Sequence, residues 1–85
     1  MEMTLNIPEY SDDQGFKFDW EPGFEIESSI ENGVIKITAN KAGLISLAKH
    51  LLNLSQDQIP AGYHLHFDET NALEDGSSEF ILEKK

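Results

Sequence analysis

The stretch FEIESSIENGVIKITANKAGLISLAKHLLNL, residues 24–54, contains the strongest local structure signals in the chain. Asn32 and Gly33 separate two runs of alternating residues, and this pair supplies the positive φ angles that a tight hairpin turn requires. The stretch therefore predicts a β-hairpin with one apolar and one polar face. The apolar face comprises Phe24, Ile26, Ile30, Ile35 and Ile37, and the polar face comprises Glu25, Glu27, Ser29, Lys36 and Thr38.

The residues after the hairpin predict one amphipathic helix over about residues 40–56. Asn40 is a good N-cap, and Pro60 and Gly62 end the segment. Gly43 lies in the first turn, where a close approach of the helix to a sheet or a partner would explain it. The apolar stripe expected to face the sheet comprises Leu44, Ile45, Leu47, Ala48, Leu51, Leu52 and Leu54.

Three further runs alternate like strands. They are FKFDW near residues 16–20, with a possible edge position, YHLHFDE at 63–69 and SEFILEK at 78–84. The chain is thus expected to form a single α+β domain over residues 1–85. Its expected fold is an antiparallel sheet of about four to five strands, in the order (β)β-ββ-α-ββ, with one helix packed on one face. The other sheet face would be open to water or to a partner.

Charge is the strongest compositional signal. Sixteen acidic residues stand against six lysines, and the formal net charge is −10. This charge argues against binding nucleic acid or anionic membrane surfaces, and it favours a basic protein partner. The chain has no cysteine, no signal-peptide pattern at its start and no apolar run of membrane-spanning length, so we expect a cytoplasmic protein.

The alternation in GYHLHFDE, residues 62–69, places His64, His66 and Asp68 on one strand face. Three interpretations are open: a solvated polar face, a partner contact and a metal site. No HExxH pattern or second ligand cluster supports a metal, so we expect no metal and no cofactor. No G-x-S-x-G elbow or Gly-rich oxyanion loop is present, so we expect no catalytic residues and no enzymatic activity.

Two residues outside this strand also have alternative interpretations. His50 is expected at the edge of the buried helical stripe. Trp20 is expected to pack at the edge of the core rather than to serve as an interface anchor.

The second half of the chain resembles a known family. Three motifs carry the resemblance in order: AN-x-x-GL-x-x-LA-x-x-LL, P-x-GYH-x-H-x-D and LEDGS-x-E, within residues 38–84. Together they resemble immunity family thirty-two, one of the immunity families of bacterial polymorphic toxin systems. Residues 1–23 do not take part in the resemblance. The matching positions are Asn40, Gly43, Leu44, Tyr63, His64, His66, Asp68, Glu74, Asp75, Gly76, Ser77 and Glu79.

The resemblance implies a cytoplasmic inhibitor that binds a cognate toxin domain, and it implies no catalytic residue. Many bacterial toxins are nucleases with basic clefts, which an acidic surface could fill. The expected partner-binding residues are His64, His66, Asp68, Glu25, Glu27 and Glu79. Two alternatives remain open: a homo-oligomeric accessory or structural subunit, and a metal-binding regulatory module.

Overall fold

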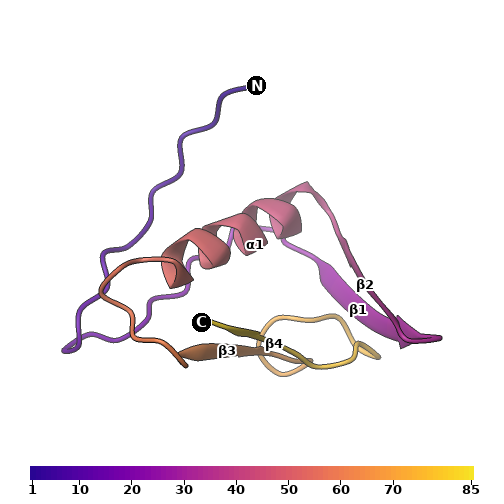
Figure 1. Cartoon of the computed structure of the whole chain (residues 1–85). Coiled ribbons are helices and arrows are strands. Elements are labelled where there is room, and N and C mark those ends of the chain that lie inside the picture. The colour runs from indigo at the N-terminus through magenta and orange to yellow at the C-terminus, as the bar shows by residue number, and fades with distance from the viewer.

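The computed structural model describes residues 1–85 and contains one helix and four strands (Figure 1). The predicted α+β class is confirmed. A single sheet is not confirmed, because the strands form two antiparallel pairs, β1–β2 and β3–β4. No helix is long and apolar enough to cross a membrane. In chain order the elements are β1 (Ile26–Glu31), β2 (Val34–Ala39), α1 (Lys41–Leu54), β3 (His64–Phe67) and β4 (Phe80–Glu83).

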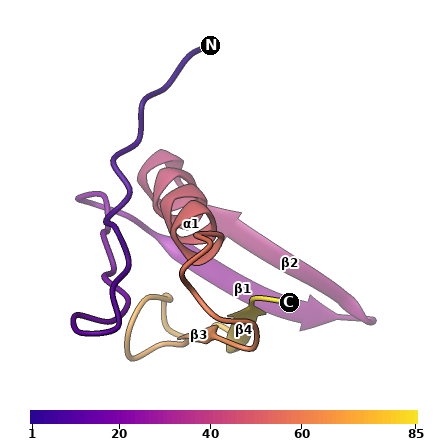
Figure 2. The same ribbon diagram turned by 60° about the vertical axis from the view of Figure 1, so that its left-hand side comes forward.

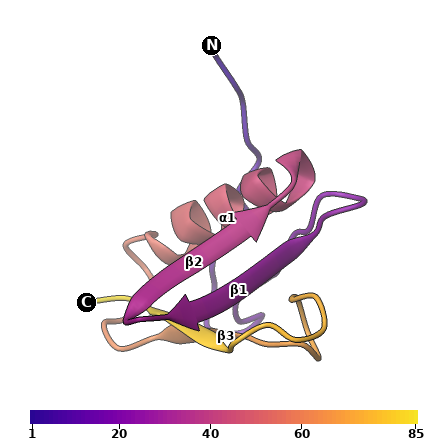
Figure 3. The same ribbon diagram turned by 90° about the vertical axis from the view of Figure 1, so that its right-hand side faces the viewer.

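The β1–β2 hairpin forms as its turn predicts. Asn32 and Gly33 have φ angles of 52° and 75°, in the left-handed region that Asn and Gly tolerate best. Ile30 lies opposite Ile35, so these two side chains share one face of the hairpin. Figure 3 shows β1 and β2 side by side, with the second hairpin beneath them.

The two hairpins are joined along the second edge of β1. The Glu74 N–H donates to the Ile26 carbonyl at 2.9 Å, and the Ser78 N–H donates to the Ser28 carbonyl at 3.0 Å. The Ser28 hydroxyl also donates to the Ser78 carbonyl. Between these bonds Gly76 turns the backbone with a φ of 87°, so residues 74–78 make isolated bonds to β1 rather than a regular ladder.

The start of α1 is positioned by its cap and by a close backbone contact. The Asn40 Oδ1 accepts from the Gly43 N–H at 2.8 Å and from the Glu25 N–H at 3.0 Å, so the cap also ties the helix to the residue before β1. A Cβ added at Gly43 would lie 2.4 Å from the Glu25 carbonyl oxygen. The predicted close approach of the helix to the hairpin is therefore confirmed.

The buried face of α1 differs from the predicted stripe. Leu54 is buried and Leu47 packs against the core, but Leu44, Leu51 and Leu52 are 57%, 52% and 49% exposed. The prediction that the whole apolar stripe faces the sheet is therefore wrong. The helix instead buries Gly43, Ser46, His50, Asn53 and Leu54, and the apolar core consists of Ile26, Leu54, Ile59, Leu65, Phe67 and Leu73.

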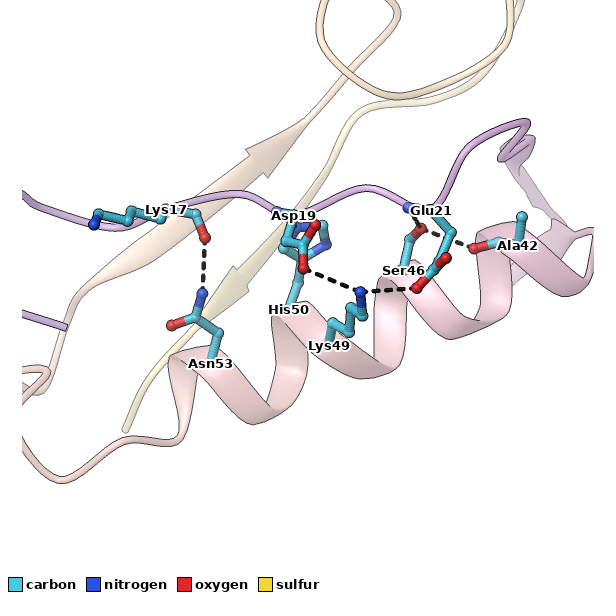
Figure 4. A network of polar contacts seen from close by, with 8 residues as sticks. All are labelled: Lys17, Asp19, Glu21, Ala42, Ser46, Lys49, His50 and Asn53. Atoms are coloured by element: carbon cyan, nitrogen blue, oxygen red, sulfur yellow. Dashed lines mark hydrogen bonds and ion pairs between the residues drawn. The ribbon is translucent and has the colours of Figure 1, made fainter. Parts of the chain in front are cut away.

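Residues 17–21 explain why polar side chains are buried on the helix (Figure 4). The Asn53 Nδ2 donates to the Lys17 carbonyl at 2.9 Å. Two residues further along the segment, the Asp19 N–H donates to the His50 Nε2 at 3.2 Å. These bonds satisfy backbone groups that would otherwise lack partners beside an apolar core.

The same pattern continues toward the start of the helix, where the Glu21 N–H donates to the Ser46 Oγ at 2.9 Å. Alternate residues of the segment thus meet helix side chains spaced four and three residues apart. The predicted strand near residues 16–20 is wrong, because this segment pairs with helix side chains and not with another strand. Figure 2 shows the N-terminal part of the chain on one side of α1 and the β1–β2 hairpin on the other.

His50 lies at the centre of this contact. Its side chain is fully buried, so the prediction that it lies at the edge of the stripe is wrong. The Trp20 ring centroid is 4.2 Å from that of His50 and 4.5 Å from that of Phe24, which confirms that Trp20 packs in the core region. Burial lowers the pKa of His50 below its usual value, against the raising effect of the Asp19 carboxylate.

Candidate functional site

The outer face of β3 presents two histidines. His64 and His66 are exposed, whereas Leu65 and Phe67, which alternate with them, are buried, as the alternation predicts. The two imidazole centroids are 5.0 Å apart. The His64 Nδ1 lies 3.1 Å from the Gly62 carbonyl oxygen, and this contact orients the imidazole at the start of β3.

Glu79, the residue directly before β4, lies next to this histidine pair. Its Oε2 lies 3.2 Å from the His66 Nδ1, and both side chains are about half exposed at 53% and 49%. Water therefore screens the pair, and protonation of the imidazole would turn the contact into an ion pair. Three of the predicted partner-binding residues, His64, His66 and Glu79, thus lie together on one exposed surface.

Asp68 directly follows β3, and its side chain stabilises the next turn by accepting hydrogen bonds. Its carboxylate accepts from the Thr70 Oγ1 at 2.6 Å, the Thr70 N–H at 2.9 Å and the Asn71 N–H at 3.2 Å. The Thr70 hydroxyl, followed by the Thr70 backbone, holds the pKa of Asp68 below its ordinary value. The carboxylate is therefore needed by the turn, and its contact with a partner stays a prediction.

Glu25 directly precedes β1, and Glu27 lies within β1 on the polar face of the first hairpin. Glu27 lines a hollow of about 250 Å³ together with Lys36 and Asp75, and no hydrophobic residue lines it. Glu25 lines an adjacent hollow with Glu27 and Glu74. The structure thus adds Glu74 and Asp75 to the acidic surface, although the sequence alone places these two residues only in a loop.

Glu79 lies between the histidine pair of β3 and the first hairpin. It contacts His66 of β3, and it lines a cleft with Ser29 of β1. No three His, Cys, Asp or Glu side chains are grouped as they would be to hold a metal ion. The carboxylates and imidazoles thus lie on an open surface and do not enclose a small, closed pocket.

The family model of Immunity protein 32 matches residues 34–85, more than half of the chain. The chain belongs to the Immunity protein 32 family. The match spans β2, α1, β3 and β4, and thus includes His64, His66, Asp68 and Glu79.

The first 33 residues lie outside the match to Immunity protein 32. These residues include β1, with Glu25 and Glu27 beside and within it, and the segment that runs along α1. No curated protein and no solved structure matches the chain.

Proposed function

We propose that this chain is an immunity protein that binds and neutralises a cognate bacterial toxin domain in the cytoplasm. Membership of the Immunity protein 32 family is the observation that carries the proposal. The chain itself performs no catalysis and uses no cofactor in this proposal. It acts by occupying a surface that the toxin needs for its activity.

The charge of the chain supports a basic toxin partner. The formal net charge is −10, and Glu25, Glu27 and Glu79 are all exposed, with Glu25 and Glu27 close to Glu74. Such a surface attracts a basic domain over distances of about 8–10 Å, beyond which physiological salt screens the field. The attraction raises the association rate more than it slows dissociation, because it acts before the two surfaces meet.

His64, His66 and Asp68 form the second part of the proposed surface. Both imidazoles are exposed on the regular strand β3, so a partner could contact them directly. Contacts made by such side chains after docking are desolvated, so their loss acts mainly on dissociation. His66→Ala is therefore expected to speed dissociation, whereas charge reversal at Glu25 and Glu27 is expected to slow association.

Co-expression tests the proposal directly. Cells carrying the toxin gene next to this gene are expected to survive only when this chain is present. The purified pair is expected to form a 1:1 complex whose association slows markedly between about 0.05 and 0.5 M salt. If no neighbouring gene product kills cells or binds the chain, the proposal is wrong.

A matched pair of variants separates a local surface from net charge alone. Glu25→Lys with Glu27→Lys changes the proposed surface, and Glu2→Lys with Glu9→Lys makes the same charge change at exposed positions of the N-terminal segment. The first variant is expected to slow association more than the second. Equal effects would show that only the total charge matters and would contradict the assigned surface.

A homo-oligomeric accessory subunit is the second candidate function. The exposed apolar side chains of Ile30, Ile35 and Leu44 are the observation that favours it, because oligomer interfaces commonly bury such groups. Light scattering at micromolar concentration distinguishes the candidates. A stable dimer that no neighbouring gene product dissociates would favour the subunit over the immunity protein.

A further inference from the structure

The apolar face of the first hairpin is only half covered. Its register places the pairs Ile26–Ala39 and Ile30–Ile35 on one face. The start of α1 lies over the first pair, since a Cβ at Gly43 would be 3.0 Å from side-chain atoms of both Ile26 and Ala39. At the other end, Ile30 and Ile35 are 61% and 66% exposed.

The uncovered end opens into a cleft between β1 and β4. The cleft has a volume of about 250 Å³ and is lined by Ile30, Ile35, Phe80 and Ile81, among other residues, with Glu79 at the same site. The last backbone bond between the hairpins joins Ser78 to Ser28, and no ladder pairs β1 with β4. The two hairpins therefore diverge immediately after this bond.

The backbone of β1 is unpaired where it borders the cleft. The carbonyls of Ile26 and Ser28 point away from β2, because both accept bonds from residues 74–78. Backbone groups of alternate residues point to the same edge, so the N–H and C=O of Ile30 point toward the cleft. An open strand edge with apolar side chains beside it is suited to pairing with one more strand.

Charge decides what kind of strand fits. A second copy of this chain would bring another net charge of −10 against Glu31, which follows Ile30, and Glu79, which lines the cleft. A segment that carries lysine or arginine beside an apolar side chain would instead complement both the cleft and its edge. The charge thus favours a basic partner over self-association.

We propose that the cleft between β1 and β4 receives an extended, basic and apolar segment of the cognate toxin, which pairs with the backbone of Ile30. This inference rests on the proposed function and identifies the apolar centre of the toxin contact. Glu79, which lines the same cleft, then supplies acidic charge beside that centre. Interfaces commonly combine an apolar centre with a polar rim in this way.

Two neighbouring residues of the hairpin provide a matched test. Ile35 and Val34 are 66% and 64% exposed, but they point to opposite faces because they are adjacent in a strand. Ile35→Glu and Val34→Glu therefore add the same charge at similar exposure. We expect Ile35→Glu to weaken binding of the toxin domain encoded by the neighbouring gene at least about tenfold, and Val34→Glu less than about threefold.

Hydrogen exchange on the unmodified chain tests the strand pairing without any substitution. The Ile30 amide is expected to exchange rapidly in the free chain and to be protected in the complex with the same toxin domain. Tenfold discrimination between the variants together with this protection supports the proposal. Equal losses for both variants, or no protection at Ile30, overturns it even if the toxin domain binds.

The remaining outcomes separate this inference from the proposed function. If the unmodified chain fails to bind the toxin domain, both are wrong. If the chain forms a dimer that Ile35→Glu dissociates, the cleft belongs to a second copy and the toxin assignment is overturned. Circular dichroism melts of both variants show whether Ile35→Glu remains folded. If this variant unfolds, protection of the Ile30 amide in the unmodified chain decides whether the toxin segment pairs with β1.

Discussion

One side of α1 buries Ser46, His50 and Asn53, whereas another leaves Leu51 and Leu52 about half exposed. The polar side chains are buried because an extended segment without a strand partner lies against them and needs its backbone groups satisfied. The leucines remain exposed because neither hairpin covers that side of the helix. Which helix side chains are buried thus depends on the backbone hydrogen bonds of residues 17–21 as well as on hydrophobicity.

The largest effect is expected from a substitution at the closest contact of the buried side. Gly43→Ala places a Cβ against the Glu25 carbonyl, a backbone atom that cannot move aside easily. We expect the free energy of unfolding to fall by about 3 kcal/mol, although alanine is the better helix former. Denaturant unfolding measures the change, with Leu44→Ala as the exposed control. A loss below 1 kcal/mol would mean that the helix can shift without cost.

A smaller effect is expected from the polar contact at the other end of the buried side. Asn53→Ala removes bonds to the Lys17 carbonyl and to the Gln56 side chain, and we expect a loss of about 1–2 kcal/mol. Leu51→Ala on the exposed side is expected to cost less than about 1 kcal/mol, because half of the side chain is already in water. The reverse order in denaturant melts would restore the apolar stripe as the buried side of the helix.

The pH dependence of stability further tests the buried side. The pKa of His50 is lowered in the folded chain, so the unfolded chain binds a proton more readily. Stability is therefore full above the unfolded value of about 6.5 and is lost as the pH falls from there toward the folded pKa. His50→Gln is expected to reduce this loss between about pH 8 and 5.5, whereas His64→Gln on the exposed strand is expected to leave it unchanged. Equal pH profiles for the unmodified chain and His50→Gln would contradict the role of His50.

The histidine strand shows how much of the candidate site was predictable. Alternation alone predicts that His64 and His66 point away from the core, because Leu65 and Phe67 require burial. It also assigns Asp68 to the same face, yet the strand ends at Phe67 and Asp68 serves the following turn. The contacts of Glu79 depend on the pairing of β3 with β4, which no local pattern specifies.

The hairpin turn at Asn32 and Gly33, the helix start at Asn40 and the alternation of β3 could all be predicted from local sequence. Each depends on φ preferences, a cap or a two-residue period within a few neighbouring residues. Local sequence did not predict which side of α1 is buried, how the strands divide into two pairs or where residues 17–21 find their partners. These outcomes depend on contacts between segments far apart in the chain, because a buried backbone group must find a partner wherever the fold provides one.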